Sequence, residues 1–166
     1  MPFLTEHPLD LTALIADVLS SGRGGIACFL GTVRDHHQGR SVRRLEYAAY
    51  APMVEAECAR IVEETERRWP VTVALRHRVG RLEIGDSAVA IAVAGAHRDE
   101  AFAACRHLIE EVKRRVPIWK REVYVDGTEE WIDPTKAGGR TDKAERRTDG
   151  RTDSADSVVL TGSRAT

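Results

Sequence analysis

The chain has 166 residues, of which 42% are hydrophobic and 31% are charged, and its formal net charge is -1. These values are typical of one soluble globular domain, and they exclude the overall basic charge of a protein that coats nucleic acid. The charge is uneven, because 18 Lys and Arg and 21 Asp and Glu precede Thr135, whereas the last 32 residues have almost no aliphatic cluster. We therefore expect a folded domain over residues 1–134 and a disordered, low-complexity charged tail over residues 135–166.

The three cysteines, Cys28, Cys58 and Cys105, are far apart and show no Cys-x-x-Cys spacing. This pattern argues against a disulfide framework or a zinc site, so we expect three core thiols, no metal and a reducing, cytoplasmic location. No stretch approaches the roughly 20 apolar residues that span a bilayer, and the N-terminus lacks a signal-peptide pattern, so we expect no contact with a membrane.

Apolar residues recur at helical or strand spacing as far as residue 132, and Gly or Pro residues separate the segments. The expected elements are a helix over 11–19, strands over 26–34 and 42–50, a helix over 52–69, strands over 71–79, 81–84 and 87–95, a helix over 100–116, and strands over 118–125 and 131–132. Strand pairs separated by helices predict an α+β fold, with helices packed on a mixed or antiparallel sheet.

Two of these strands are nearly continuous apolar runs. Residues 26–34 and 87–95 are therefore expected to be buried on both faces, the second as a central strand. Gly31, inside the first run, indicates a bulge or a close backbone approach. His77 is in register with valines and is expected to be a structural histidine of the sheet.

The segment 113–122 carries five cations around Val-Pro-Ile-Trp and joins the last helix to a strand, because Pro117 cannot continue a helix. Lys113 lies at the edge of an apolar stripe made by Phe102, Cys105, Ile109, Val112 and Val116. Two interpretations of Lys113 remain open. Its methylenes cover apolar surface while the ammonium reaches water, or it is a partly buried amine whose pKa is lowered by Arg114 and Arg115.

Three polar junctions follow strands or end a helix, where sites are usually built. They are residues 34–37, the pair His97-Arg98 at a predicted helix N-terminus, and Lys113 with Lys120-Arg121. Together they offer guanidinium, imidazole and amine groups for an anion. The sequence has no nucleophile elbow, no activated cysteine and no carboxylate cage for a metal. A reaction that needs a nucleophile other than lysine would therefore have to receive it from another molecule.

Six stretches carry a resemblance to a known family. They are 29–34, Tyr50 with Met53, 68–70, 77–80 with Gly85-Asp86, 96–98 with Ala101-Phe102, and 113–122 with its Pro-x-Trp-Lys-Arg-Glu motif. In this order and spacing, from Leu11 to Trp131, the chain resembles the large, catalytic subunit of molybdopterin synthase.

The resemblance implies an α/β hammerhead fold, a homodimer, and a small ubiquitin-like subunit at each end, giving a heterotetramer. The small subunit's C-terminal thiocarboxylate would supply two sulfurs to cyclic pyranopterin monophosphate, with no permanently bound cofactor, to form the dithiolene of molybdopterin. By motif position, Lys113 and Lys120 would be catalytic, and some pocket groups would come from the second monomer. The substrate-binding residues would be Arg34, His97, Arg98, Lys113, Lys120, Arg121 and Glu122. His36, His37 and Arg40 are not markers of the family and are left out of this expected site.

Two other interpretations of the residues remain. A stand-alone phosphate-ester or acyl-phosphate hydrolase would use Arg34 and His97-Arg98 to hold phosphate while water attacks. An α+β anion-binding or RNA-binding module would use Trp119 together with the basic residues of 113–121, although an acidic body with only 5% aromatic residues weighs against it.

Overall fold

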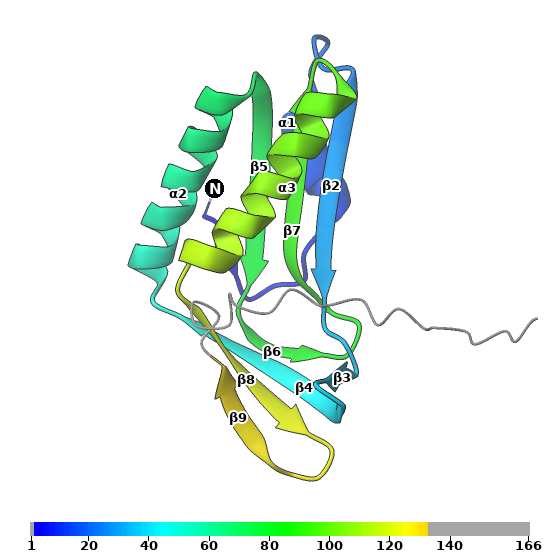
Figure 1. Ribbon diagram of the computed structural model, residues 1–166, viewed down its shortest axis with the longest axis vertical. Helices are drawn as coiled ribbons and strands as arrows, with labels where there is room; N and C mark the ends of the chain where they lie inside the picture. Colours follow the sequence, from blue (N-terminus) through cyan, green and yellow to red (C-terminus); the bar gives the residue numbers. More distant parts are fainter. Residues whose placement is uncertain (1, 133–166) are drawn as a thin grey trace, which may run out of the picture.

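The computed structural model describes residues 2–132, and the expected tail at 135–166 lies outside this part (Figure 1). The described elements are β1 (Leu4–Thr5), α1 (Leu11–Val18), β2 (Gly25–Thr32), β3 (His36–His37), β4 (Arg40–Ala49), α2 (Ala51–Arg68), β5 (Val71–Arg78), β6 (Gly80–Glu83), β7 (Ser87–Gly95), α3 (Arg98–Arg115), β8 (Ile118–Tyr124) and β9 (Glu129–Ile132). The α+β class predicted from the sequence is confirmed. The two-residue strands β1 and β3 were not predicted, because so short a strand has no periodicity of its own.

The first sheet has the strand order β1-β5-β7-β2, in which only the β1–β5 pair is parallel. Helices α2 and α3 cover one face, and α1 lies behind the other (Figure 1). Strand β7 is central and buried almost throughout, as predicted. Its valines and Ile91 pack toward α2 and α3, whereas Ala90, Ala92 and Ala94 pack against α1. This division follows from the alternation of side chains along a strand.

Strand β2 is the edge of this sheet, and the expectation that both its faces are buried is wrong. Its residues alternate, so Ala27 is buried while Ile26, Cys28 and Leu30 are exposed. The face that carries these three is the α1 face, but the eight-residue α1 packs over β5 and β7. The prediction of a core thiol is therefore wrong for Cys28 and confirmed for the other two cysteines.

Gly31 of β2 shows both features that the sequence indicated. The register of the β2–β7 pair shifts between Gly31 and Thr32, and a Cβ at residue 31 would lie 2.7 Å from a methyl of Val89. A side chain cannot fit at that distance without moving β7.

The second sheet has the order β3-β4-β8-β9, with β6 also paired to β4. It lies beyond the ends of β2, β5 and β7 (Figure 1). A small core closes it, formed by Val33, Val42, Leu45, Leu82, Ala88 and Tyr124. Two of the crossings between the sheets lie just after β2 and just after α3, and residues at these two crossings meet at one seam. Within residues 2–132, none of the helices has both the length and the hydrophobicity that a bilayer crossing requires.

Candidate active site

A cleft of about 940 Å³ lies at the seam between the two sheets. Its walls come from β2, the β3–β4 hairpin, the last two turns of α3, and β8. The polar lining residues are Thr32, Arg34, His36, His37, Tyr47, His77, Glu110, Lys113, Arg114, Lys120 and Glu122. The cleft therefore gathers four cations from three separate segments of the chain, against two carboxylates.

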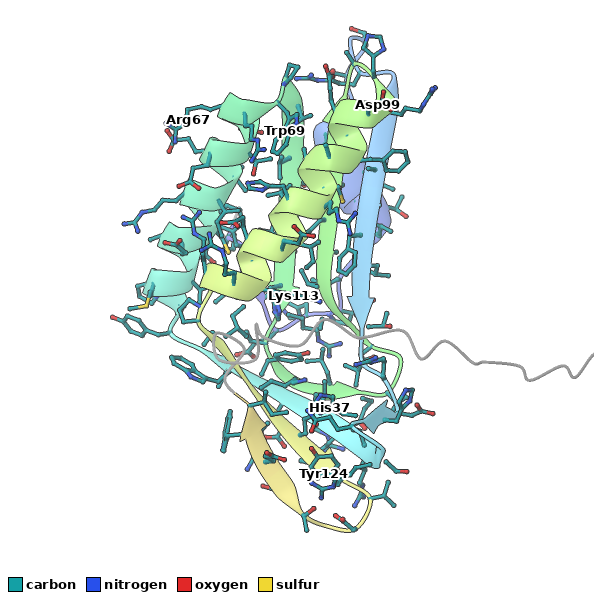
Figure 2. The ribbon with its side chains drawn as sticks, viewed as in Figure 1. His37, Arg67, Trp69, Asp99, Lys113 and Tyr124 are labelled. Atoms are coloured by element: carbon teal, nitrogen blue, oxygen red, sulfur yellow. The ribbon has the colours of Figure 1, made fainter. Side chains whose placement is uncertain are left out.

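Lys113 lies in the last turn of α3 and points toward the seam (Figure 2). The buried face of α3 consists of Ala101, Ala104, Cys105, Leu108, Ile109 and Val112. Phe102 is 64% exposed, so its assignment to the apolar stripe is wrong, and Lys113 is an exposed residue next to Val112. The geometry agrees with the interpretation in which the lysine reaches water.

The two arginines that follow Lys113 are paired with glutamates. Arg114 donates to Glu111 from Nε at 3.1 Å, and Arg115 donates to Glu57 from Nε at 2.6 Å. Arg115 also bonds Glu64. Arg115 is therefore turned toward α2 and does not line the cleft, whereas Arg114 lines it together with Lys113. Within residues 2–132, Lys113 and Arg34 form no salt bridge, so both cations face the cleft without a carboxylate partner.

Lys120 and Glu122 are two positions apart on β8 and therefore share the face that lines the cleft. The Lys120 Nζ lies 2.7 Å from Glu122 Oε1. Glu122 is only 2% exposed, and its Oε2 accepts from His37 Nδ1 at 2.8 Å and from the Tyr124 hydroxyl at 2.8 Å. Burial raises the pKa of Glu122, but the hydrogen bonds from Lys120 and Tyr124 outweigh it and hold this pKa below the usual value. Glu122 is thus a buried carboxylate with its charge compensated.

Tyr47 and His77 also line the cleft. Their rings meet edge to face with centroids 5.3 Å apart, and the His77 Nδ1 donates to the Arg78 carbonyl at 2.8 Å. Burial raises the pKa of Tyr47 to about 12 and lowers that of His77 to about 4, so both groups are neutral near pH 7. The bonded His77 agrees with the structural role expected for it.

Arg121 and Trp119 lie on the opposite face of β8 from Lys120, because side chains alternate along a strand. Arg121 pairs with Glu46 and Glu129 and lies over the Trp131 ring, outside the cleft. The structure therefore does not bring Arg121 to the site expected for it. The same alternation separates Trp119 from Lys113 and Lys120, so the single surface required by the RNA-binding interpretation is not formed.

His97 and Arg98 are at the N-terminal end of α3, as predicted, but at the far end of the helix from Lys113. Asp99, the next residue, marks this end in Figure 2. At 1.5 Å per residue, Arg98 and Lys113 are about 22 Å apart along the axis. His97 and Arg98 line a second hollow with Gly24, Ala96 and Asp99. Within one chain, then, the structure brings together Arg34, Lys113, Lys120 and Glu122 and leaves His97 and Arg98 apart.

His37 is the residue of this site that sequence reasoning left out. It contacts Glu122 across 85 positions in the chain, and no local pattern encodes such a contact. The one available signal was Gly39, a residue that favours tight turns and that here helps to turn the chain back beside His37.

The fold and the cleft define a class: an α+β protein in which two sheets meet at a basic, anion-accepting seam. Comparison with known proteins narrows this class. The family model described as "MoaE protein" matches residues 4–115. A protein of Pyrococcus abyssi named molybdopterin synthase catalytic subunit is 49% identical over 133 residues, which cover 78% of this chain and 89% of that protein.

Solved structures agree. The crystal structure of molybdopterin synthase from Staphylococcus aureus matches with a TM-score of 0.75 and 35% identity, covering 78% of this chain and 94% of that one. A complex of subunits 1 and 2 of molybdopterin-converting factor from Helicobacter pylori matches with a TM-score of 0.64 at 20% identity, over 87% of this chain and 90% of that one, which shows a shared fold. This chain belongs to the MoaE protein family, and the resemblance inferred from its sequence is confirmed.

Proposed function

We propose that this protein is the catalytic subunit of molybdopterin synthase. It transfers two sulfurs to cyclic pyranopterin monophosphate, each from the C-terminal thiocarboxylate of a small ubiquitin-like carrier subunit that is left as a carboxylate, and so forms the dithiolene of molybdopterin. The observation that carries the proposal is the convergence of Arg34, Lys113 and Lys120 on one cleft in a chain of the MoaE family. The name of the Pyrococcus relative and the two-subunit Helicobacter complex support the activity and the carrier partner.

Each cleft residue has a role that suits its surroundings. The unpaired Arg34 guanidinium binds the phosphate or another anionic group of the substrate. Lys113 donates and accepts protons while the C–S bonds form, and Lys120 offsets negative charge that develops on the thiocarboxylate. Neither serine nor cysteine is among the described lining residues, which accords with a sulfur nucleophile that arrives on the carrier's tail.

We further propose that two copies of this chain form a homodimer through β2, so that with two carriers the assembly is a heterotetramer. The unpaired β2 edge and the exposed Ile26 and Leu30 offer a surface for a second copy. Gly25, where β2 begins, lies against the backbone of Arg98, and Thr32, where it ends, lines the cleft. Antiparallel pairing of two such strands sets His97 and Arg98 of one copy beside the cleft of the other. His97 and Arg98 lie far from the cleft of their own chain, and in the dimer they would serve the cleft of the other copy.

The proposed reaction needs no permanently bound cofactor or metal, since the carrier supplies the sulfur and the lysines supply the proton transfers. We place the protein in the cytoplasm, where cysteines such as Cys28, Cys58 and Cys105 remain reduced.

The test is reconstitution of sulfur transfer from purified components. The protein is mixed with a thiocarboxylated ubiquitin-like carrier and cyclic pyranopterin monophosphate, and dithiolene product is measured. Lys113→Ala is expected to lower the rate by about 10²-fold or more, the usual contribution of a positioned acid–base group, without changing the melting temperature. Arg106→Ala, which removes a cation that is 82% exposed on the same helix, is the matched control and should keep full activity.

Two results would contradict the proposal. Phosphate release from small esters without any carrier would point to the hydrolase. A Lys113→Ala protein that unfolds would show that the side chain serves packing.

A further inference from the structure

His37 is held by a two-residue hairpin. Strand β3 pairs with β4, with His37 opposite Arg40, and both turn residues are left-handed, with φ of 48° at Gln38 and 79° at Gly39. Two consecutive positive φ values define a type I′ turn, which fixes the register of its strands. The neighbouring His36 lies at the exposed rim of the cleft and, among the described residues, bonds only Asp35.

From this hairpin the His37 ring reaches the buried carboxylate of Glu122. Glu122 is ionised, as its lowered pKa indicates, so it can only accept hydrogen bonds. His37 Nδ1 and the Tyr124 hydroxyl, each 2.8 Å away, must therefore both donate to Oε2. Burial first and then Glu122 raise the pKa of Tyr124 to about 12, which keeps the phenol protonated and able to donate.

With Oε2 occupied in this way, Oε1 is left for Lys120, whose Nζ lies 2.7 Å from it. A lysine side chain has four rotatable bonds, and its ammonium is held only as firmly as its partner is. Here the partner is fixed from two sides, by β3 through His37 and by β8 through Tyr124. Two further charges adjoin this network: Arg40 stacks on the Tyr124 ring at 3.4 Å, and Glu130 lies 3.4 Å from the Tyr124 hydroxyl.

We propose that His37 is a positioning residue of the active site, which orients Glu122 so that Glu122 fixes the Lys120 ammonium in the cleft. The inference rests on the function proposed above for Lys120. It assigns to the β3–β4 hairpin a part in the reaction, although His37 needs no contact with substrate. An ammonium fixed in advance opposes developing charge without having to be ordered at the moment of reaction.

Steady-state kinetics of three variants test the role of the His37 ring. His37→Ala removes the donor, His37→Asn retains an N–H donor near the position of Nδ1, and His7→Ala, which removes an exposed imidazole outside the cleft, is the matched control. Loss of a hydrogen bond to a charged group is expected to lower kcat about tenfold in His37→Ala, with KM changed less than about twofold. We expect His37→Asn to recover most of the rate and His7→Ala to equal the parent protein.

A second readout does not depend on activity. In ¹⁵N-labelled protein, an ammonium held by a buried carboxylate exchanges its protons slowly and gives an NMR signal, which Lys120→Arg identifies by its loss. We expect the Lys120 signal in the parent protein, His7→Ala and His37→Asn, and at least about tenfold faster exchange in His37→Ala. If the parent protein transfers no sulfur, the proposed function fails, while this signal still decides whether His37 holds Lys120.

Two outcomes would overturn the inference. Equal losses of rate in His37→Asn and His37→Ala would mean that the imidazole itself does chemistry, and unchanged Lys120 exchange in His37→Ala would mean that it positions nothing. Should His37→Ala fail to fold, Tyr124→Phe removes the other donor to Oε2 and must accelerate Lys120 exchange for the inference to stand.

Discussion

His77 shows how burial changes the chemistry of one residue. The ring sits between Tyr47 and the Arg78 carbonyl, and burial lowers its pKa to about 4. In the unfolded chain the same imidazole has a pKa of about 6.5. Between these values the unfolded state binds more protons than the folded state, so folding stability falls as the pH drops from about 6.5 to about 4.

Replacing His77 by Phe should remove this part of the pH dependence. Between pH 7 and pH 5 the parent protein is expected to lose about 2 kcal/mol more unfolding free energy than His77→Phe, because only the parent must keep a buried imidazole neutral. Urea denaturation of both proteins at the two pH values measures the difference. Parallel losses in the two proteins would mean that His77 titrates normally in the folded state.

Residue by residue, the sequence was informative where chemistry follows a local pattern. The helix-to-strand junction at Pro117 placed Lys113 and Lys120 near each other, and the valine register marked His77 as structural. The prediction from sequence failed for Arg121, because it placed all the basic residues of one run in one pocket. Successive side chains of a strand point to opposite faces, so Lys120 and Arg121 cannot share a pocket. The prediction also failed for His37, whose partner is 85 positions away.

At the scale of elements, α2 and α3 are joined by one guanidinium. Arg115, 21% exposed, reaches Glu57 and Glu64 on α2 and Glu111 on its own helix. The hydrogen bonds that Arg115 donates to Glu64 are the largest cause of the raised pKa of Arg115. Because the last turn of α3 also carries Lys113, this network ties the amine to the neighbouring helix.

Arg115→Met is expected to lower the unfolding free energy by about 2 kcal/mol, because it removes the cation shared by Glu57, Glu64 and Glu111 and leaves Glu57 and Glu111 with only the more exposed Arg60 and Arg114. Arg114→Met is the matched control: this neighbouring side chain is 68% exposed, bonds only Glu111 among the described residues, and should be replaceable without measurable loss. Denaturant titrations of the two variants give the comparison. Equal stabilities would show that the network contributes nothing to the α2–α3 contact.

The elements themselves were largely predictable, because apolar spacing and Gly or Pro breaks gave every helix and the longer strands. Which faces of the elements are buried was not predictable from the sequence. An apolar run such as β2 fits a central strand and an edge strand equally well, and only the short α1, which covers β5 and β7, leaves Ile26 and Leu30 exposed.

At the scale of the whole molecule, the proposed dimer completes each site with residues from both copies. Mixing Lys113→Ala with Arg98→Ala, each inactive alone, should then restore activity. Random exchange makes about half of the dimers mixed, each with one intact site, so about a quarter of the parent activity is expected.

Sulfur-transfer assays after unfolding and refolding the two variants together measure this recovery, and the same treatment of each variant alone is the control. A mixture that stays inactive would show that His97-Arg98 and Lys113 do not meet between copies. Leu30→Glu, which places a charge on the β2 face, should make the protein monomeric in sedimentation, whereas Leu19→Glu, at an equally apolar residue that is 60% exposed after α1, should not.

The alternation of β8 divides the hexapeptide 117–122 between two surfaces. The side chains of Ile118, Lys120 and Glu122 line the cleft, whereas those of Trp119 and Arg121 lie on the outer face of the sheet. A single contiguous motif thus supplies side chains to two separate surfaces, so a substitution within it is expected to disturb only the surface that the substituted residue faces.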